Sequence, residues 1–281
     1  MHPPARLAVV GHRAELGTCL PPEPLAGLEV GWVERPVDPD PAALRAAVER
    51  LRPDVVAVLE PQAGDGALLD GLGAVRLAWL VADCDPSADD GARCADFDRV
   101  VAASAGAARR APDCAPWRIE PLPVSDALFA AVGAPGTPPR VFFDGPTCPR
   151  RDTILQPTKH NFDVLHLAGG GTPERLGGLI GRCDVALDLR EEPGVALRDR
   201  VGTALAAGLL VIAESPLERP GLLRGHHVLT FANVWDLHDI LLGLRRHPDA
   251  MRSLRVRGRR HAERLRASVA LPRLVAEVLA G

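Results

Sequence analysis

Residues 182–215 decide the fold and read Arg-Cys-Asp-Val-Ala-Leu-Asp-Leu-Arg-Glu-Glu-Pro-Gly-Val-Ala-Leu-Arg-Asp-Arg-Val-Gly-Thr-Ala-Leu-Ala-Ala-Gly-Leu-Leu-Val-Ile-Ala-Glu-Ser. The apolar run Val185–Leu189 predicts a buried strand, and Ala196–Ala207 predicts a helix of small residues. Gly208 stands where the end of a helix favours a left-handed residue, and Leu209–Ala213 predicts a second strand. A strand, charged loop, helix and strand in this order are typical of the ligand-binding edge of an open α/β sheet.

Length and composition are those of an ordinary globular protein. The chain has 281 residues, enough for two domains, and 47% of them are hydrophobic. A net charge of −3 and the absence of tyrosine argue against a basic or base-stacking nucleic-acid binder. No apolar run reaches the ~20 residues of a membrane span. The six cysteines form no Cys-x-x-Cys pair, so we expect a cytoplasmic protein with reduced thiols.

The first half of the chain alternates apolar runs with helical patterns, which predicts a parallel sheet. The expected strands are Ala5–Val10, Pro53–Leu59, Val75–Val81 and Phe97–Ala102, followed by a last piece at Trp117–Pro121. The expected helices are Pro41–Leu51, Gly66–Leu72 and Ser125–Val132. We therefore predict a first Rossmann-like domain over residues 1–134.

A second Rossmann-like domain is predicted over residues 138–281. The linker between the two domains is expected at Ala134–Pro139, which is rich in residues that interrupt helices and strands. Further strands are expected at Arg140–Phe143 and Phe162–Ala168, and helices at Glu174–Gly181, Val234–Arg246 and His247–Ala267. The last helical residues, Leu271–Ala280, are expected to pack on the N-terminal half. The second half has few strand–helix units and therefore looks trimmed.

The stretch quoted above resembles the donor-binding half of GT-B glycosyltransferases. The residues that match the motif of that family, in order, are Asp184, Glu191 or Glu192, Gly194, Arg200, Ala204, Ala206 and Gly208. The likeness covers roughly residues 138–275. It is greatest for the spore-maturation-type branch, because Gly225–Asn233 and two closing helices continue the match. The resemblance implies an α/β protein with two Rossmann-like domains that face each other across a cleft.

The resemblance also implies roles for residues of the motif. In the family, the glutamate matched by Glu191 or Glu192 contacts the donor sugar, and Arg200 stands at the arginine of the motif. A second glutamate of the family accepts hydrogen bonds from the ribose, but this chain has Thr203 there, whose hydroxyl carries no charge. Glu214 is a candidate substitute. The departure leaves two options open, a different donor contact or a loss of catalysis.

A glycine followed by basic residues after the first strand of the second half is suited to a diphosphate. Gly145 lets the backbone approach a ligand, and Arg150 and Arg151 carry forked donors. In related glycosyltransferases a downstream basic residue also grips the diphosphate, and Lys159, the only lysine of the chain, is similar. The alternative is that these side chains are solvated surface charges.

Two residues of the first half are candidates for a general base. His12 follows the first expected strand, and Asp83, the favoured candidate, follows Val75–Val81. An acceptor hydroxyl needs such a base if the sugar is transferred with inversion. No histidine pair at four-residue spacing has a carboxylate partner, so we expect no metal site.

Together these observations predict a glycosyltransferase that moves a sugar from a nucleoside-diphosphate-sugar donor to an unknown acceptor, without a metal or a bound cofactor. We expect no nucleic-acid partner and no transmembrane segment. The alternative prediction is a catalytically silent GT-B-like module that acts in binding or as a scaffold. The threonine at position 203, the trimmed second half and the small first domain favour that alternative.

Overall fold

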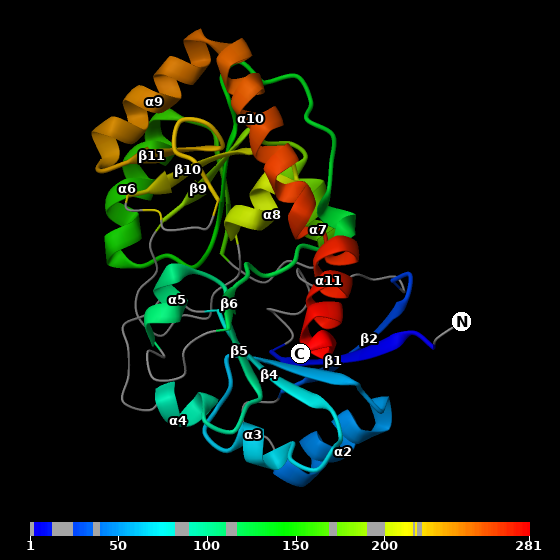
Figure 1. Cartoon of the computed structure of the whole chain (residues 1–281). Helices are drawn as coiled ribbons and strands as arrows, with labels where there is room; N and C mark the ends of the chain where they lie inside the picture. Colours follow the sequence, from blue (N-terminus) through cyan, green and yellow to red (C-terminus); the bar gives the residue numbers. More distant parts are fainter. Residues whose placement is uncertain are drawn as a thin grey trace. The chain divides into compact units, whose positions relative to one another are not determined.

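The computed structural model describes residues 3–12, 25–35, 40–81, 90–110, 117–168, 173–189, 200–215, 217 and 221–281 (Figure 1). The chain divides into two compact units. The first contains the described residues up to 123 together with 267–281, and the second contains those from 124 to 266. Each unit is built on a parallel sheet, and each is described by itself below.

The sheet of the first unit has the strand order β2-β1-β3-β4-β5-β6 within the described residues. Its strands are β1 (Ala5–Gly11), β2 (Leu28–Glu34), β3 (Val55–Leu59), β4 (Val75–Leu80), β5 (Arg99–Ala102) and β6 (Arg118–Ile119). Its helices are α2 (Pro41–Leu51), α3 (Asp65–Leu68), α4 (Asp90–Cys94), α5 (Ala105–Arg110) and α11 (Ala267–Ala280). The order of the strands reverses between β1 and β3, since β2 lies on one side of β1 and β3 on the other.

Both faces of the first sheet are covered, because successive strand side chains point to opposite faces. Leu7 and Val9 of β1 share a core with Leu271 and Leu274 of the last helix, α11. Ala8 and Val10 share a core with Leu44 and Val48 of α2 on the other face. The C-terminal helix therefore completes the N-terminal unit.

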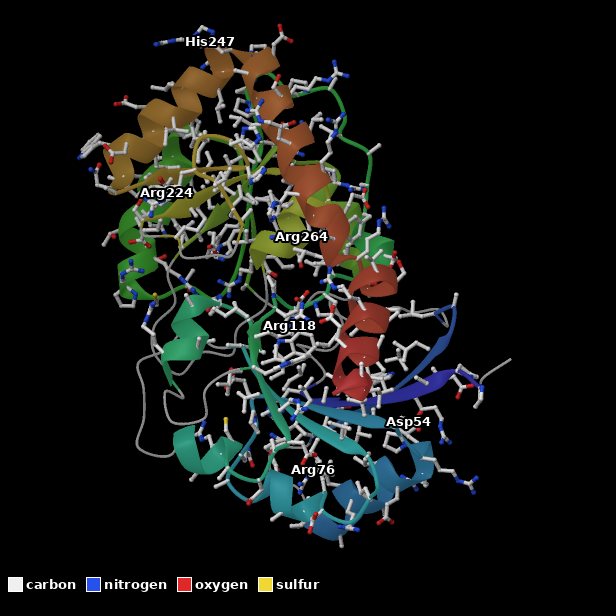
Figure 2. The ribbon with its side chains drawn as sticks, in the orientation of Figure 1. Asp54, Arg76, Arg118, Arg224, His247 and Arg264 are labelled. Carbon is white, nitrogen blue, oxygen red and sulfur yellow. The ribbon has the colours of Figure 1, made fainter. Side chains whose placement is uncertain are left out.

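Ion pairs also hold α11 in the first unit. Arg118 of β6, labelled in Figure 2, pairs with Glu277 of α11. Arg118 and Arg273 both pair with the carboxylate of Glu120, which follows β6.

The second unit has the strand order β11-β10-β9-β7-β8, all parallel. Its strands are β7 (Val141–Asp144), β8 (Val164–Leu167), β9 (Val185–Asp188), β10 (Leu210–Glu214) and β11 (Val228–Phe231). Its helices are η2 (Asp126–Leu128), α6 (Pro149–Asn161), α7 (Pro173–Ile180), α8 (Arg200–Ala206), α9 (Val234–Arg246), α10 (Pro248–Ala262) and η3 (Glu263–Leu265). The described sheet thus has one strand, β11, that the sequence patterns did not predict.

Helices α6 and α9 cover one face of this sheet, and α7 and α8 cover the other. Ile154 and Leu155 of α6 pack with Leu237 of α9 against one set of strand side chains. Leu176 of α7 and Leu205 of α8 pack against the alternate set. The connection from β7 to β8 and the connection from β8 to β9 therefore use different faces.

The start of the second unit differs from the expected order of elements. The expected linker Ala134–Pro139 lies inside the unit, where the Gly136 N–H donates to the Asp184 carboxylate at 3.1 Å. The expected helix Ser125–Val132 is only the single turn η2. It ends there because the Ala130 N–H donates to the carbonyl of Ala206 in α8, at 3.2 Å, and not to its own helix.

None of the helices in the described part of the chain has both the length and the apolar character needed to span a bilayer.

Candidate functional site

The second unit has a reversal of strand order between β7 and β9. Strand β7 leads into α6 on one face of the sheet, and β9 precedes α8 on the other face. In open α/β sheets, ligands bind outside the carboxyl ends of the strands at such a reversal. We therefore take the residues that follow β7, and those at the start of α8, as the candidate ligand site.

Gly145 and Arg200 lie next to each other at this reversal. Gly145 follows β7 with a φ of 155°, a conformation that favours glycine. A Cβ atom at this position would lie 3.2 Å from Cζ of Phe143 and 3.3 Å from Cζ of Arg200. The absence of a side chain at 145 therefore leaves room for the Arg200 guanidinium, which reaches back from the first residue of α8.

The first turn of α6 carries two arginines with different surroundings. Arg150 forms an ion pair with Glu214 at the carboxyl end of β10. Arg151 is only 1% exposed, and its Nη1 donates to the Pro146 carbonyl at 3.1 Å. Arg151 thus supports the loop between β7 and α6 from the interior, whereas the Arg150 side chain remains 39% exposed.

His166 bridges Lys159 and Gly145, and the sequence patterns did not single out this histidine. The Lys159 ammonium lies 2.9 Å from Nδ1 of His166, in β8. Nε2 of the same ring lies 2.8 Å from the carbonyl oxygen of Gly145. A histidine one residue before the end of an otherwise apolar strand was the available sequence signal.

Thr203 lies on the same face of α8 as Arg200. Five residues of this short helix are buried, whereas Arg200 and Thr203, three positions apart, are half-buried. Position 203 is therefore not in the core. Glu191 and Glu192, the other residues that the motif implies for the donor, lie outside the described residues.

In the first unit, His12 follows β1 at the reversal between β1 and β3. Its Nδ1 lies 3.0 Å from the Arg35 carbonyl oxygen, which can only accept a hydrogen bond. The neutral ring therefore carries its proton on Nδ1 and leaves the lone pair on Nε2. The second candidate base, Asp83, lies outside the described residues.

Arg35, whose carbonyl contacts His12, is linked to two further charged residues, Asp65 and Glu60, and the sequence patterns singled out none of the three. Arg35 is 3% exposed, pairs with Asp65 and donates to the Glu60 carbonyl at 3.2 Å. Its Nε has no hydrogen-bond partner among the described residues. Because these bonds fix Arg35, they also fix the carbonyl that orients the His12 ring.

Glu60, at the end of β3, has a left-handed backbone with a φ of 45°. Its N–H donates to the Trp79 carbonyl at 2.9 Å, and its carboxylate accepts from the Val81 N–H at 2.5 Å. A non-glycine residue adopts this conformation only when its surroundings hold it, and such residues cluster at functional sites. A charged residue directly after a buried strand was the sequence signal for it.

The described residues hold no group of three or more His, Cys, Asp or Glu side chains arranged for a metal ion.

The chain is similar to known proteins in structure, whereas the sequence comparisons found no match. No protein-family model matches, and no curated protein matches by sequence. Among solved structures, Anabaena Alr3699/HepE in complex with UDP-glucose superposes with a TM-score of 0.66 at 11% identity, over 98% of this chain and 99% of that chain. Sucrose-phosphate synthase from Thermosynechococcus elongatus gives 0.62 at 13% identity, over 98% and 99%. A glycosyltransferase from Rickettsia africae gives 0.62 at 11% identity, over 99% of both chains.

These similarities confirm the predicted fold. The neighbours are GT-B proteins, and the chain has the GT-B fold of two Rossmann-like domains. The match covers nearly the whole of both chains, so the second half is not trimmed relative to them. The spore-maturation-type branch is not singled out and stays a prediction.

Proposed function

We propose that the chain is a glycosyltransferase that moves a hexose from a nucleoside-diphosphate-sugar donor to an acceptor. The observation that carries this proposal is the Arg200 guanidinium against Gly145, with Lys159 linked to the Gly145 carbonyl through His166, at the strand reversal of the second unit. A neighbour of the same fold that holds UDP-glucose supports a nucleotide-sugar ligand.

The site has the positive charge that a leaving diphosphate needs. The Arg200 guanidinium lies against Gly145, where the backbone is bare and a phosphate can approach closely. The 13-residue helix α6 begins four residues further on, and the Cys148 side chain does not cap its first turn. Helix N-termini and arginines both stabilise phosphate oxygens. We propose that these groups, without a metal ion or bound cofactor, stabilise the departing diphosphate.

The sugar and ribose contacts are assigned by the motif. We propose that Glu191 or Glu192 contacts the donor sugar and that the Thr203 hydroxyl bonds the ribose. Glu214 was a candidate for the ribose contact, but its carboxylate pairs with Arg150. We therefore assign Glu214 to the orientation of Arg150.

His12 is our first choice for the general base, with Asp83 as the second candidate. The lone pair on Nε2 of His12 is available to take the proton of an acceptor hydroxyl. In a displacement with inversion, the acceptor oxygen would bond to the anomeric carbon as the bond to the diphosphate oxygen breaks. The proton would pass to Nε2, and the diphosphate would leave with the electron pair.

The alternative function is a silent GT-B-like module that binds a partner or ligand without transfer. The observation that favours it is Thr203, which supplies no carboxylate at the position of the ribose-binding glutamate.

The test begins with binding of UDP, GDP, ADP, TDP and CMP, measured by thermal shift and titration calorimetry. We expect one diphosphate to stabilise the wild-type protein, and to stabilise it less in Arg200→Met. The matching nucleotide sugar should then release its diphosphate slowly in water, with or without EDTA, and His12→Gln should reduce transfer to an added acceptor. No stabilisation at millimolar ligand would overturn the proposal. Binding without any diphosphate release would favour the silent module.

A further inference from the structure

We infer that His166 is a positioning residue of the donor site and that Lys159 acts through it. The inference rests on the proposed function, because the site that it positions is the nucleoside-diphosphate site at Gly145. It changes the role of Lys159, which the sequence alone assigns to direct contact with the diphosphate.

Three elements meet at the His166 ring. The ring belongs to β8, the ammonium beside it comes from the end of α6, and the carbonyl on its other side follows β7. Phe143 of β7 lies against the same ring, with a centroid distance of 5.1 Å. The ring thus bridges α6 to the loop that follows β7.

The two hydrogen bonds determine which ring nitrogen carries the proton. An ammonium can only donate, so Nδ1 of His166 must accept from Lys159, at 2.9 Å. The Gly145 carbonyl can only accept, so Nε2 must donate, at 2.8 Å. Lys159 and the Gly145 carbonyl therefore both select the Nε2–H form of a neutral ring.

This form of the ring fixes the Gly145 peptide in place. The Gly145 carbonyl accepts from His166, while its N–H donates to the Leu167 carbonyl at 2.8 Å. Both polar groups of Gly145 are thus held by neighbouring residues of the β8 segment. Since the Arg200 guanidinium lies against Gly145, the same bonds set the surface that a phosphate would meet.

The first measurement reads the tautomer directly and needs no ligand. Nitrogen-15 labelling of histidine, with His166 assigned through His166→Gln, reports which ring nitrogen carries the proton. We expect Nε2–H in the wild-type protein and in Lys159→Arg, which keeps a donor. In Lys159→Met only the Gly145 carbonyl still favours Nε2–H, so the fraction of that form should be smaller than in the wild-type protein. An Nδ1–H form in the wild-type protein would overturn the inference.

The second measurement is the affinity for the diphosphate that binds best. His166→Leu removes both hydrogen bonds and should weaken binding by about tenfold, the equivalent of one hydrogen bond. His166→Gln should restore most of the affinity, because its amide can accept from Lys159 and donate to Gly145. The exposed His160→Gln in the same helix as Lys159 is the matched control and should bind as wild type.

The double variant Lys159→Met/His166→Leu separates the two roles of Lys159. If Lys159 acts through His166, the double variant should bind no more weakly than His166→Leu alone. If Lys159 touches the phosphate, the two losses should add, and the inference would be wrong. A wild-type protein that binds no nucleotide would instead contradict the proposed function, and the tautomer measurement would still decide the arrangement around His166.

Discussion

Arg255 and Asp184 form a buried ion pair that joins helix α10 to the edge of the sheet where β9 begins. Nη1 of Arg255 donates to Asp184 at 3.0 Å, and its Nε donates to the Gly208 carbonyl at 2.7 Å. Asp184 also accepts from the backbone N–H groups of Gly136 and Arg140, both at 3.1 Å. Burial lowers the pKa of Arg255, and Asp184 opposes that shift.

Asp184→Asn should therefore destabilise the protein strongly. Removal of one partner leaves the other charge buried and uncompensated, which costs about 3–5 kcal/mol. The free energy of unfolding in urea measures the effect. Asp163→Asn is the matched control, because Asp163 pairs with Arg140 at the surface, and its substitution should cost much less than that of Asp184. Equal losses in the two variants would contradict the assigned role of the buried pair.

A second prediction concerns pH and the contact between the His227 and His261 rings beside Arg264, which is labelled in Figure 2. Nε2 of His261 lies 2.9 Å from Nη2 of Arg264, and its ring lies 4.5 Å from that of His227. Burial, Arg264 and His227 lower the pKa of His261 to about 4 from 6.5. His226, Arg264 and Arg257 also contribute, after burial, to the lowered pKa of His227.

The sign of the pH effect follows from these pKa values. Between pH 6.5 and about 4 the unfolded chain binds a proton at His261 that the folded chain does not. The contribution of the neutral His261 ring to the free energy of unfolding is therefore complete above pH 6.5, and it is lost as the pH falls to about 4. The free energy of unfolding, measured in urea at a series of pH values across this range, should change less with pH in His261→Gln than in the wild-type protein. An equal change in the two proteins would assign the pH dependence to other groups.

Much of the fold follows from local sequence signals. Helix α2 is as predicted because Asp40 caps it and Pro41 begins it. Helix α9 is as predicted because Asn233 accepts from two N–H groups of its first turn. Helix α6 was not predicted. It carries Pro157 inside it and buries Arg151 and Thr158 together with Ile154 and Leu155, so its apolar residues follow no helical stripe.

The candidate site was less predictable because its contacts join distant segments. Gly145 and Arg200 were each singled out, yet their proximity depends on the strand order β9-β7. His166 was missed because its role depends on Lys159 and Gly145, which belong to other elements. Short-range patterns identify residue types suited to a ligand, whereas the topology decides which of them meet.

Gly145→Ala tests whether the bare backbone at the strand reversal is needed. The added Cβ would crowd Phe143 and Arg200 and sit on a backbone that favours glycine, so we expect a loss of about 1–3 kcal/mol in stability. Nucleotide affinity should fall as Arg200 is displaced. Gly243→Ala in α9 is the control, because a Cβ atom there would meet open space. This variant should gain up to about 1 kcal/mol in stability. A stable Gly145→Ala variant with wild-type affinity would argue against a tight approach at Gly145.

Thr203→Glu tests the motif alignment. Position 203 is half-buried beside Arg200 on α8, so a longer side chain can reach outward and the protein should remain folded. A carboxylate there should tighten nucleotide binding through charge-assisted hydrogen bonds to the ribose. Thr203→Gln, which has the same length without the charge, is the matched control. If Thr203→Glu unfolds the protein in a thermal scan, the alignment of the motif at 203 is wrong.

The last prediction concerns the arginine at the start of α8. In the proposed site the Arg200 guanidinium meets a diphosphate beside the bare backbone of Gly145. Charge-assisted hydrogen bonds contribute roughly 1.5–3 kcal/mol each, so Arg200→Met should weaken diphosphate affinity by about ten- to a hundred-fold. Affinity for the corresponding nucleoside, which has no phosphate, should change little. Arg200→Lys should recover only part of the loss, because lysine keeps the charge but lacks the planar fork. Titration calorimetry of the three proteins with both ligands measures these differences, and equal diphosphate affinities would remove Arg200 from the site.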